Sequence, residues 1–175
     1  MTNSHRLGSI ISGVDFFREK FRTAFWLQSR WKETLWLEGH KLVAINAGRT
    51  DTAHSTCLHV PSIGLIVGGD VVYNGIHPFL GETNTQSRIE WIATLDKLET
   101  LKPKAVIAGH KVPENDDNPR IIAETRQYLR DFNRLNTATT TARELYDAML
   151  EIYPDRVNPG SLWGAANAAK KYTQL

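Results

Sequence analysis

Two apolar segments of the chain each end in glycine followed by a residue that can bind a metal ion. The segment LIVGGD ends at Asp70, and the segment KAVIAGH ends at His110. Glycine lets the backbone turn sharply and approach a ligand closely, while carboxylate oxygens and imidazole nitrogens are common zinc ligands. We therefore expect both side chains to project from one edge of a sheet into a shared site.

A polar loop, AGRTDTAHST at residues 47–56, offers further candidates for the lining of that site. Arg49, Thr50 and His54 lie in this loop, and His77 lies in the later segment NGIHPF. Polar loops that enter or leave buried strands are frequent locations for binding residues. We expect these four residues to line the site without binding a metal ion themselves.

Each candidate also has a purely structural interpretation. Asp70 could cap a turn after its strand, and His110 could be a buried histidine bonded to backbone. His77 precedes a proline in a loop, where a histidine need have no role. Cys57 lies within a strand pattern and has no evident base beside it, so we expect a small buried hydrophobic residue rather than a nucleophile.

Hydrophobic periodicity predicts the elements that must position these residues. Segments in which apolar residues recur every three or four positions are typical of helices. Segments in which apolar residues alternate with polar ones, or follow one another without a break, are typical of strands. Asn118 can cap a helix with Pro119 in its first position, Thr141 and Glu144 fit a capping box, and Ser161 can cap a last helix. The predicted elements are a helix at 13–32, two strands around a Gly39-His40 turn, strands at 57–60 and 63–70, a helix at 86–101, a strand at 104–110, and helices at 121–135, 142–152 and from 161 onward.

Length, composition and charge narrow the class of protein. The 175 residues fit one domain, and 41% hydrophobic with 23% charged residues is ordinary globular usage. A formal charge of +2 gives little attraction to phosphate backbones, so we expect no nucleic-acid partner. One cysteine excludes an internal disulfide. Because we find no leader and no apolar run long enough for a membrane span, we expect a cytoplasmic protein without a membrane partner.

The order of these motifs resembles a known family. The succession GRTDTAHSTCLHVPSIGLIVGGDVVYN and then VIAGHKVPENDD is similar to the C-terminal half of the metallo-beta-lactamase superfamily of metallohydrolases. In that family a Gly-His-Thr loop, a strand-end Gly-Asp and a later strand-end Gly-His supply three of the metal ligands. The resemblance runs from about Thr34 to at least Asn133. It implies that Asp70 corresponds to the carboxylate that bridges two metal ions, and His110 to a terminal ligand of the second ion.

The sequence departs from the family pattern in two places. The family's His-x-His-x-Asp-His cluster has no counterpart, since no two of the six histidines are spaced by one residue. Where the pattern has Gly-His-Thr, this chain has Arg49, whose protonated guanidinium cannot coordinate zinc. Asp70 and His110 are then two ligands where catalytic zinc ordinarily takes three. We expect Arg49 to form a salt bridge with Asp70, and we expect no cofactor unless a second chain completes a zinc site.

The resemblance implies an α+β fold that is half of the family's αββα sandwich, with one mostly antiparallel sheet and helices packed on it. We expect a single domain over 1–175, made of an aromatic amphipathic helix at 1–32, a metallo-beta-lactamase-like half-fold at 33–135 and C-terminal helices at 136–175. In the family two sheets face each other, so the inner face of one sheet alone would expose apolar area at about 25 cal/mol per Å². We expect a second copy of the chain to bury that face in a C2 homodimer, with residues 14–32 taking part.

These expectations favour a truncated, catalytically inactive protein that acts as a homodimeric binding or interaction protein. The alternative is a metal-dependent hydrolase of esters, lactones or thioesters, with its site completed by a second chain or a separately encoded N-terminal half. A third hypothesis rests on composition alone. It is a small-ligand carrier that uses an aromatic surface around Trp26, Trp31, Trp36 and Trp91.

Overall fold

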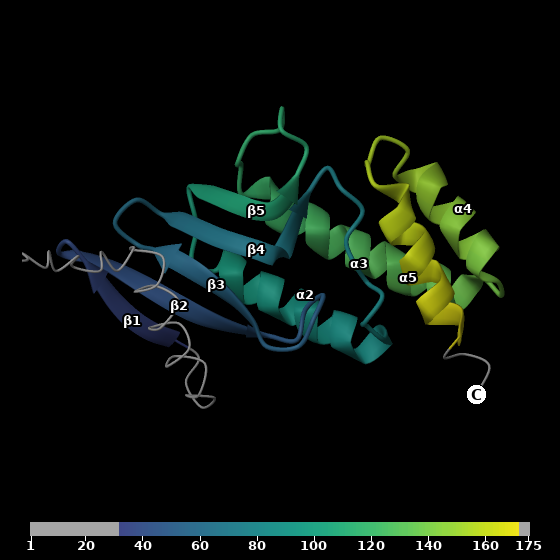
Figure 1. Cartoon of the computed structure of the whole chain (residues 1–175), viewed down its shortest axis with the longest axis horizontal. Coiled ribbons are helices and arrows are strands. Elements are labelled where there is room, and N and C mark those ends of the chain that lie inside the picture. Colours follow the sequence, from purple (N-terminus) through teal and green to yellow (C-terminus); the bar gives the residue numbers. More distant parts are fainter. Residues whose placement is uncertain (1–31, 172–175) are drawn as a thin grey trace, which may run out of the picture.

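The structure is a computed structural model that describes residues 32–171 (Figure 1). The predicted order of four strands, a helix, a strand and three helices is confirmed. The helix expected at 13–32 lies outside the described residues, apart from Lys32, which begins the first strand. The elements are β1 (Lys32–Leu37), β2 (His40–Gly48), β3 (Ser55–Val60), β4 (Leu65–Asn74), α2 (Thr85–Glu99), β5 (Ala105–Lys111), α3 (Arg120–Ala138), α4 (Ala142–Ile152) and α5 (Pro159–Lys171).

The five strands form one sheet in which their order in space follows their order in the chain. Strands β1 to β4 pair antiparallel with their neighbours, and β5 pairs parallel with β4. A parallel pair needs a crossover, which here contains α2. The expected α+β class with a mostly antiparallel sheet is therefore confirmed.

The first hairpin turns one residue earlier than the sequence analysis predicted. Glu38 and Gly39 form the two-residue turn, with φ of 49° and 80°, and His40 is already the first residue of β2. A two-residue hairpin loop of this kind needs positive φ at both central positions, because its twist must match that of the strands. Glycine adopts this backbone freely, whereas Glu38 does so at some cost.

Local capping residues begin two of the helices, and one of these caps was predicted from the sequence. The capping box of α4 is confirmed, because the Thr141 side chain accepts from the backbone N–H of Glu144 and the Glu144 side chain accepts in return. Helix α2 has a second capping box, between Asn84 and Ser87, which the sequence analysis did not find. It starts the helix at Thr85, one residue before the predicted start.

The predicted starts of the other two helices need correction. Helix α5 begins at Pro159, where the missing N–H of proline costs nothing, so Ser161 is inside the helix. Its hydroxyl donates instead to the carbonyl of Pro78, 3.0 Å away. In front of α3, Asn118 accepts from the backbone N–H of Arg120 as a cap should, but Pro119 lies at the boundary rather than within the helix.

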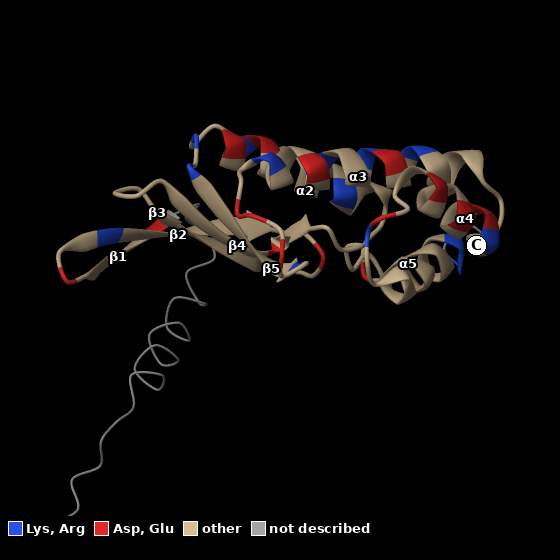
Figure 2. Ribbon diagram, turned by 90° about the horizontal axis from the view of Figure 1, so that it is seen from above, with Lys and Arg blue, Asp and Glu red and all other residues tan. Residues whose placement is uncertain are grey.

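Helices α2 and α3 cover one face of the sheet, and α4 and α5 lie beyond the sheet against α3 (Figure 2). Alternate residues of the strands point under the two helices and form the core with their apolar side chains. The buried core side chains include Val43, Ile45, Cys57, Ile66, Val106, Trp91, Leu95, Leu98, Leu129 and Phe132.

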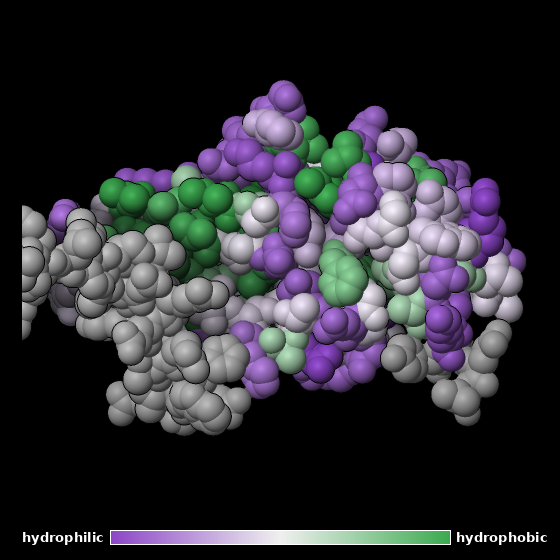
Figure 3. Space-filling view, in the orientation of Figure 1, coloured by the Kyte–Doolittle hydropathy of each residue, from purple (hydrophilic) through white to green (hydrophobic). Residues whose placement is uncertain are grey.

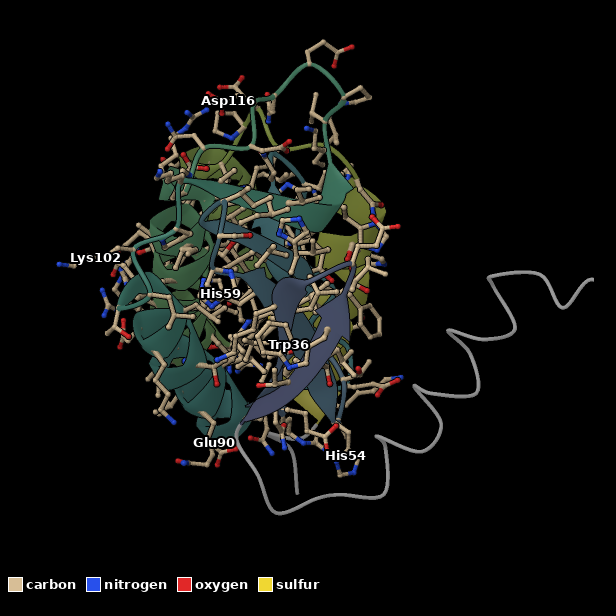
Figure 4. All side chains as sticks on the ribbon, turned by 90° about the vertical axis from the view of Figure 1, so that its left-hand side faces the viewer. Trp36, His54, His59, Glu90, Lys102 and Asp116 are labelled. Carbon is tan, nitrogen blue, oxygen red and sulfur yellow. The ribbon has the colours of Figure 1, made fainter. Side chains whose placement is uncertain are left out.

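The buried position of Trp91 contradicts the carrier hypothesis at that residue. Trp91 is 0% exposed, and its indole N–H donates to the carbonyl of Val71 at 2.8 Å. Ile89, two residues before Trp91 in the same helix, is 49% exposed. Trp36 is exposed on β1 (Figure 4), whereas Trp26 and Trp31 lie outside the described residues.

The second face of the sheet is apolar, and among the described residues no helix covers it (Figure 2). The strand residues between the core positions point to this side, and Figure 3 shows hydrophobic side chains gathered over the strands there. We call this surface the open face. It is made of Leu35, Leu42, Ala44, Leu58, Val60, Leu65, Val67 and Ile107, which pair across the strands and are all partly or largely exposed. None of the described helices is long and apolar enough to cross a membrane.

Candidate functional site

A bulge in β4 creates the candidate site at the edge of the sheet. The pair Gly69–Ala108 is followed by the pair Tyr73–His110, so three residues of β4 face a single residue of β5. Extra residues on one strand bend it and redirect its side chains. Gly69 enters the bulge with φ +54°, a conformation that suits glycine. The second glycine of the LIVGGD segment therefore has a defined structural role.

Asp70 is the first residue of the bulge, and its carboxylate lies directly over Gly109 of β5. A Cβ built on Gly109 would collide with Oδ1 of Asp70 and would press on the backbone of Gly69. Glycine is therefore required here for close approach rather than for an unusual φ. The two segments that end in Asp70 and His110 therefore fit together, because Gly109 in the second leaves room for the carboxylate of Asp70 in the first.

The structure brings Asp70 and His110 together. Oδ1 of Asp70 lies 3.4 Å from Nε2 of His110, and the two side chains are 45% and 58% exposed. His110 is thus not the buried, backbone-bonded histidine of the structural interpretation. Both side chains face solvent, Asp70 at the bulge within β4 and His110 one residue before the end of β5.

The spacing of these two atoms suits two ligands of one zinc ion. Zinc binds nitrogen and oxygen at about 2.0–2.2 Å with tetrahedral angles near 109°, so two of its ligand atoms lie about 3.4 Å apart. The Asp70–His110 distance matches this edge. However, the described residues 32–171 hold no group of three or more His, Cys, Asp or Glu residues that could bind a metal ion.

Two neighbours of this pair were not singled out from the sequence. The ring of Tyr73 stacks on His110, with centroids 5.6 Å apart and planes within 14°, and fixes one face of the imidazole. Burial raises the pKa of the Tyr73 hydroxyl, and the negative charges of Asp51 and Asp70 raise it further. The apolar pattern of β4 gave Tyr73 no distinguishing signal, because only the bulge brings it opposite His110.

Asp51 is an acidic residue buried in the loop between β2 and β3. Burial raises the pKa of its carboxyl, and the charge of Asp70 raises it too, against hydrogen bonds that lower it. The hydroxyl of Thr50, itself buried, donates to Oδ1 of Asp51 at 2.9 Å and lies 2.5 Å from the hydroxyl of Ser55. The position of Asp51, directly after Arg49-Thr50 in a polar loop, was the available signal.

The structure does not form the expected salt bridge between Arg49 and Asp70. The Arg49 guanidinium donates to the backbone carbonyl of Glu82 at 3.1 Å, and Asp70 has His110 as its ionic partner. The exposed side chain of Arg49 is long enough to reach the loop before α2, where the carbonyl of Glu82 accepts its hydrogen bond. His54 is exposed near the tip of the β2–β3 loop, at φ 63°, and lies at the margin of the molecule in Figure 4.

His77 lies in the core rather than at the solvent-facing pair. It is 0% exposed, its Nδ1 lies 2.8 Å from the hydroxyl of Tyr128, and its Nε2 has no hydrogen-bond partner among the described residues. Burial lowers the pKa of His77 to about 4, and the positive charge of Arg156 adds to this. His77 is therefore neutral at pH 7, and its hydrogen bond with Tyr128 links the loop after β4 to α3.

Comparisons with known proteins show which proteins the chain resembles. The chain is similar to a metallo-beta-lactamase family protein from Thermus thermophilus, with 20% identity, a TM-score of 0.58, and 83% of this chain and 48% of that chain covered. A metallo-beta-lactamase from Pontibacter korlensis is also similar, with 21% identity, a TM-score of 0.47, and coverage of 57% and 46%. The chain thus spans about half the length of these proteins. No curated protein sequence matches it.

The sequence also matches the family model of the metallo-beta-lactamase superfamily over residues 11–110, which is more than half of its 175 residues. The matched range contains the β2–β3 loop, Asp70 and His110, and the likeness to the Thermus protein shows the same fold. The chain therefore belongs to the metallo-beta-lactamase superfamily.

Proposed function

We propose that this chain is a homodimeric binding or interaction protein that does not catalyse hydrolysis on its own. The observation that carries the proposal is the small number of ligand-type side chains at the site. Among residues 32–171, Asp70 and His110 meet at the β4 bulge, and no third His, Cys, Asp or Glu completes a metal-binding group with them.

The two residues that could come closest to serving as a third ligand, Arg49 and Asp51, are poor metal ligands. Arg49 holds the position of the family's loop histidine, and its guanidinium has no free lone pair and repels cations. Asp51 is close enough to feel the charge of Asp70, but one of its oxygens already accepts from Thr50 and burial favours its neutral form. Two exposed ligands leave zinc with too few protein bonds for tight binding, since a catalytic site normally supplies three.

The open face supports the homodimer. Burial of apolar surface is favourable by about 25 cal/mol per Å². A complex in which a partner covers the open face is stabilised in proportion to the apolar area that it buries. A second copy carries the same apolar surface, and a two-fold axis would place the two surfaces against each other.

Calorimetric titration of the full chain with zinc tests the first part. We expect no binding at sub-micromolar affinity, and Asp70→Ala should not change the titration. One equivalent bound tightly in the wild type and lost in the variant would contradict the proposal. Light scattering during size exclusion tests the second part, since we expect twice the chain mass of 19.8 kDa. A monomer would refute the dimer.

A metal-dependent hydrolase is the second candidate, and the 3.4 Å spacing of Asp70 and His110 favours it. A bound metal ion would polarise a carbonyl group and acidify a bound water. A second polypeptide would have to supply the remaining ligands, while Asp70 and His110 would hold one side of the ion. Metal analysis of protein purified without chelator, with an ester, lactone and thioester screen, tests this candidate. Activity that disappears in Asp70→Asn would replace the first proposal by the second.

A further inference from the structure

The open face has a definite size, which sets what can cover it. Five strands about 4.8 Å apart, with two apolar rows of side chains about 6.8 Å apart, make a surface of about 24 Å by 14 Å, or roughly 330 Å². A stable interface buries about 800 Å² on each partner. Two bare open faces would therefore supply less than half of the area that a stable dimer needs. Additional apolar surface has to come from elsewhere in the chain.

We propose that residues 13–31 cover the open face as an amphipathic helix. This inference rests on the proposed homodimer and changes its interface, because the helix would lie between the open face and the second copy. The segment is directly joined to Lys32, the first residue of the edge strand β1, so it enters at the margin of the sheet. As a helix, 19 residues would be about 28 Å long, which exceeds the roughly 24 Å width of the face.

The side-chain pattern of the segment suits one apolar contact surface. At about 100° per residue, Phe17, Phe21 and Phe25 fall on one side of a helix. Glu19 and Arg30 fall on the opposite, outer side, where they can remain in water. Arg22 falls between the two sides, and Arg18 lies beside Phe25 at the margin of the phenylalanine side. Trp26 also falls on that outer side. It is thereby positioned to contact the second copy of the proposed dimer.

The covalent connection favours this occupant over a separate protein. A segment joined to the edge of the face by a peptide bond has an effective concentration of the order of millimolar, whereas a separate partner loses its translational freedom on binding. The eight residues of the open face are uncharged, and the charged residue beside them, Glu33, lies opposite Ala44 on the edge strand β1.

Hydrogen–deuterium exchange with peptide mass spectrometry on the full 175-residue chain tests the inference. Peptides within 14–31 should exchange roughly 100-fold more slowly than an unstructured chain. Ala44→Arg places a charge at the centre of the open face and should return these peptides to the unstructured rate. Glu151→Arg, at an exposed position of α4, is the matched control and should leave them protected.

A second variant covers the case in which Ala44→Arg fails to fold. Phe21→Asp changes only the segment, and it should abolish protection of 14–31 while strand peptides stay protected. Thr23→Asp introduces the same charge on the outer side of the helix and should preserve protection. Unprotected 14–31 peptides in the wild type would overturn the inference. So would protection that persists in folded Ala44→Arg or in Phe21→Asp.

Light scattering separates this inference from the proposed function. Slow exchange of 14–31 in a monomer supports the covering helix and refutes the dimer. A dimer with fast exchange of 14–31 refutes the covering helix, because a second copy would then lie directly on the open face.

Discussion

Replacement of Gly109 by alanine tests the most specific packing relation in the site. A Cβ at this position would overlap Oδ1 of Asp70 and would lie 3.0 Å from the carbonyl carbon and 3.2 Å from the Cα of Gly69. The carboxylate is half exposed and can swing away, but the Gly69 backbone belongs to the paired strand β4 and can only move with it. We therefore expect Gly109→Ala to disturb the β4–β5 pairing as well as Asp70.

The expected cost follows from the number of atoms that must shift. Overpacking of this kind costs about 1–3 kcal/mol. A domain of this size loses roughly 2–4 °C in Tm for each kcal/mol, so a cost near 2 kcal/mol should lower Tm by about 4–8 °C. Gly164→Ala is the matched control. Gly164 lies within α5 with open space around its Cα, and the same substitution there should raise stability by about 0.5–1 kcal/mol.

Urea unfolding followed by circular dichroism measures both variants, and a double-mutant cycle identifies the cause. Asp70→Ala removes the overlapping oxygen, so Gly109→Ala should cost about 0.5–1.5 kcal/mol less in that background than in the wild type. The remaining cost reports the contact with Gly69. If Gly109→Ala is as stable as the wild type, or if its cost is the same with and without Asp70, the close approach described here is wrong.

Three further predictions concern buried and loop residues. The pKa of His77 is about 4 in the folded state and near 6.5 in the unfolded chain, so the unfolded chain binds more protons between these pH values. The free energy of unfolding should therefore fall by up to about 3 kcal/mol as the pH drops from 6.5 to 4, and His77→Gln should flatten this slope in urea unfolding. Arg88→Ala should destabilise the protein by about 3 kcal/mol in the same assay, because it removes a buried side chain together with its hydrogen bonds to Thr83 and Asn133, and unchanged stability would contradict this. Arg49→His adds an imidazole to the β2–β3 loop and should raise zinc affinity by about tenfold or more in calorimetry, while Arg49→Gln should not.

Much of the fold could be predicted from local patterns. The order of elements follows from hydrophobic period, and the α4 start follows from Thr141 and Glu144, because a capping box involves residues three apart and needs no tertiary contact. Asp70 and His110 could be placed together because each follows an apolar run and a glycine. The predicted end of the strand at Asp70 is wrong by four residues, because the chain bulges there and β4 continues to Asn74. The errors at the first turn and at Ser161 are shifts of one or two residues, where the φ of Glu38 and the proline at 159 decided the boundary.

The surroundings of the site could not be predicted in this way. Tyr73 reaches His110 only because a bulge shifts the register of β4, and neither residue signals this shift locally. Arg49 binds the Glu82 carbonyl, which is 33 residues away in the chain, and Trp91 is buried although its neighbour Ile89 is exposed. Such outcomes depend on tertiary contacts that override spacing and propensity.

The matching order of strands in the chain and in the sheet bears on how the protein folds. Each of the first three pairings closes only a short connection, so β1 to β4 can assemble progressively with a small loss of chain entropy at each step. The pairing of β5 with β4 instead closes the long connection over residues 75–104 and requires α2 to dock in the same event. The late, entropically expensive step of folding is therefore the one that brings Asp70 and His110 together, and the site forms only when the sheet is complete.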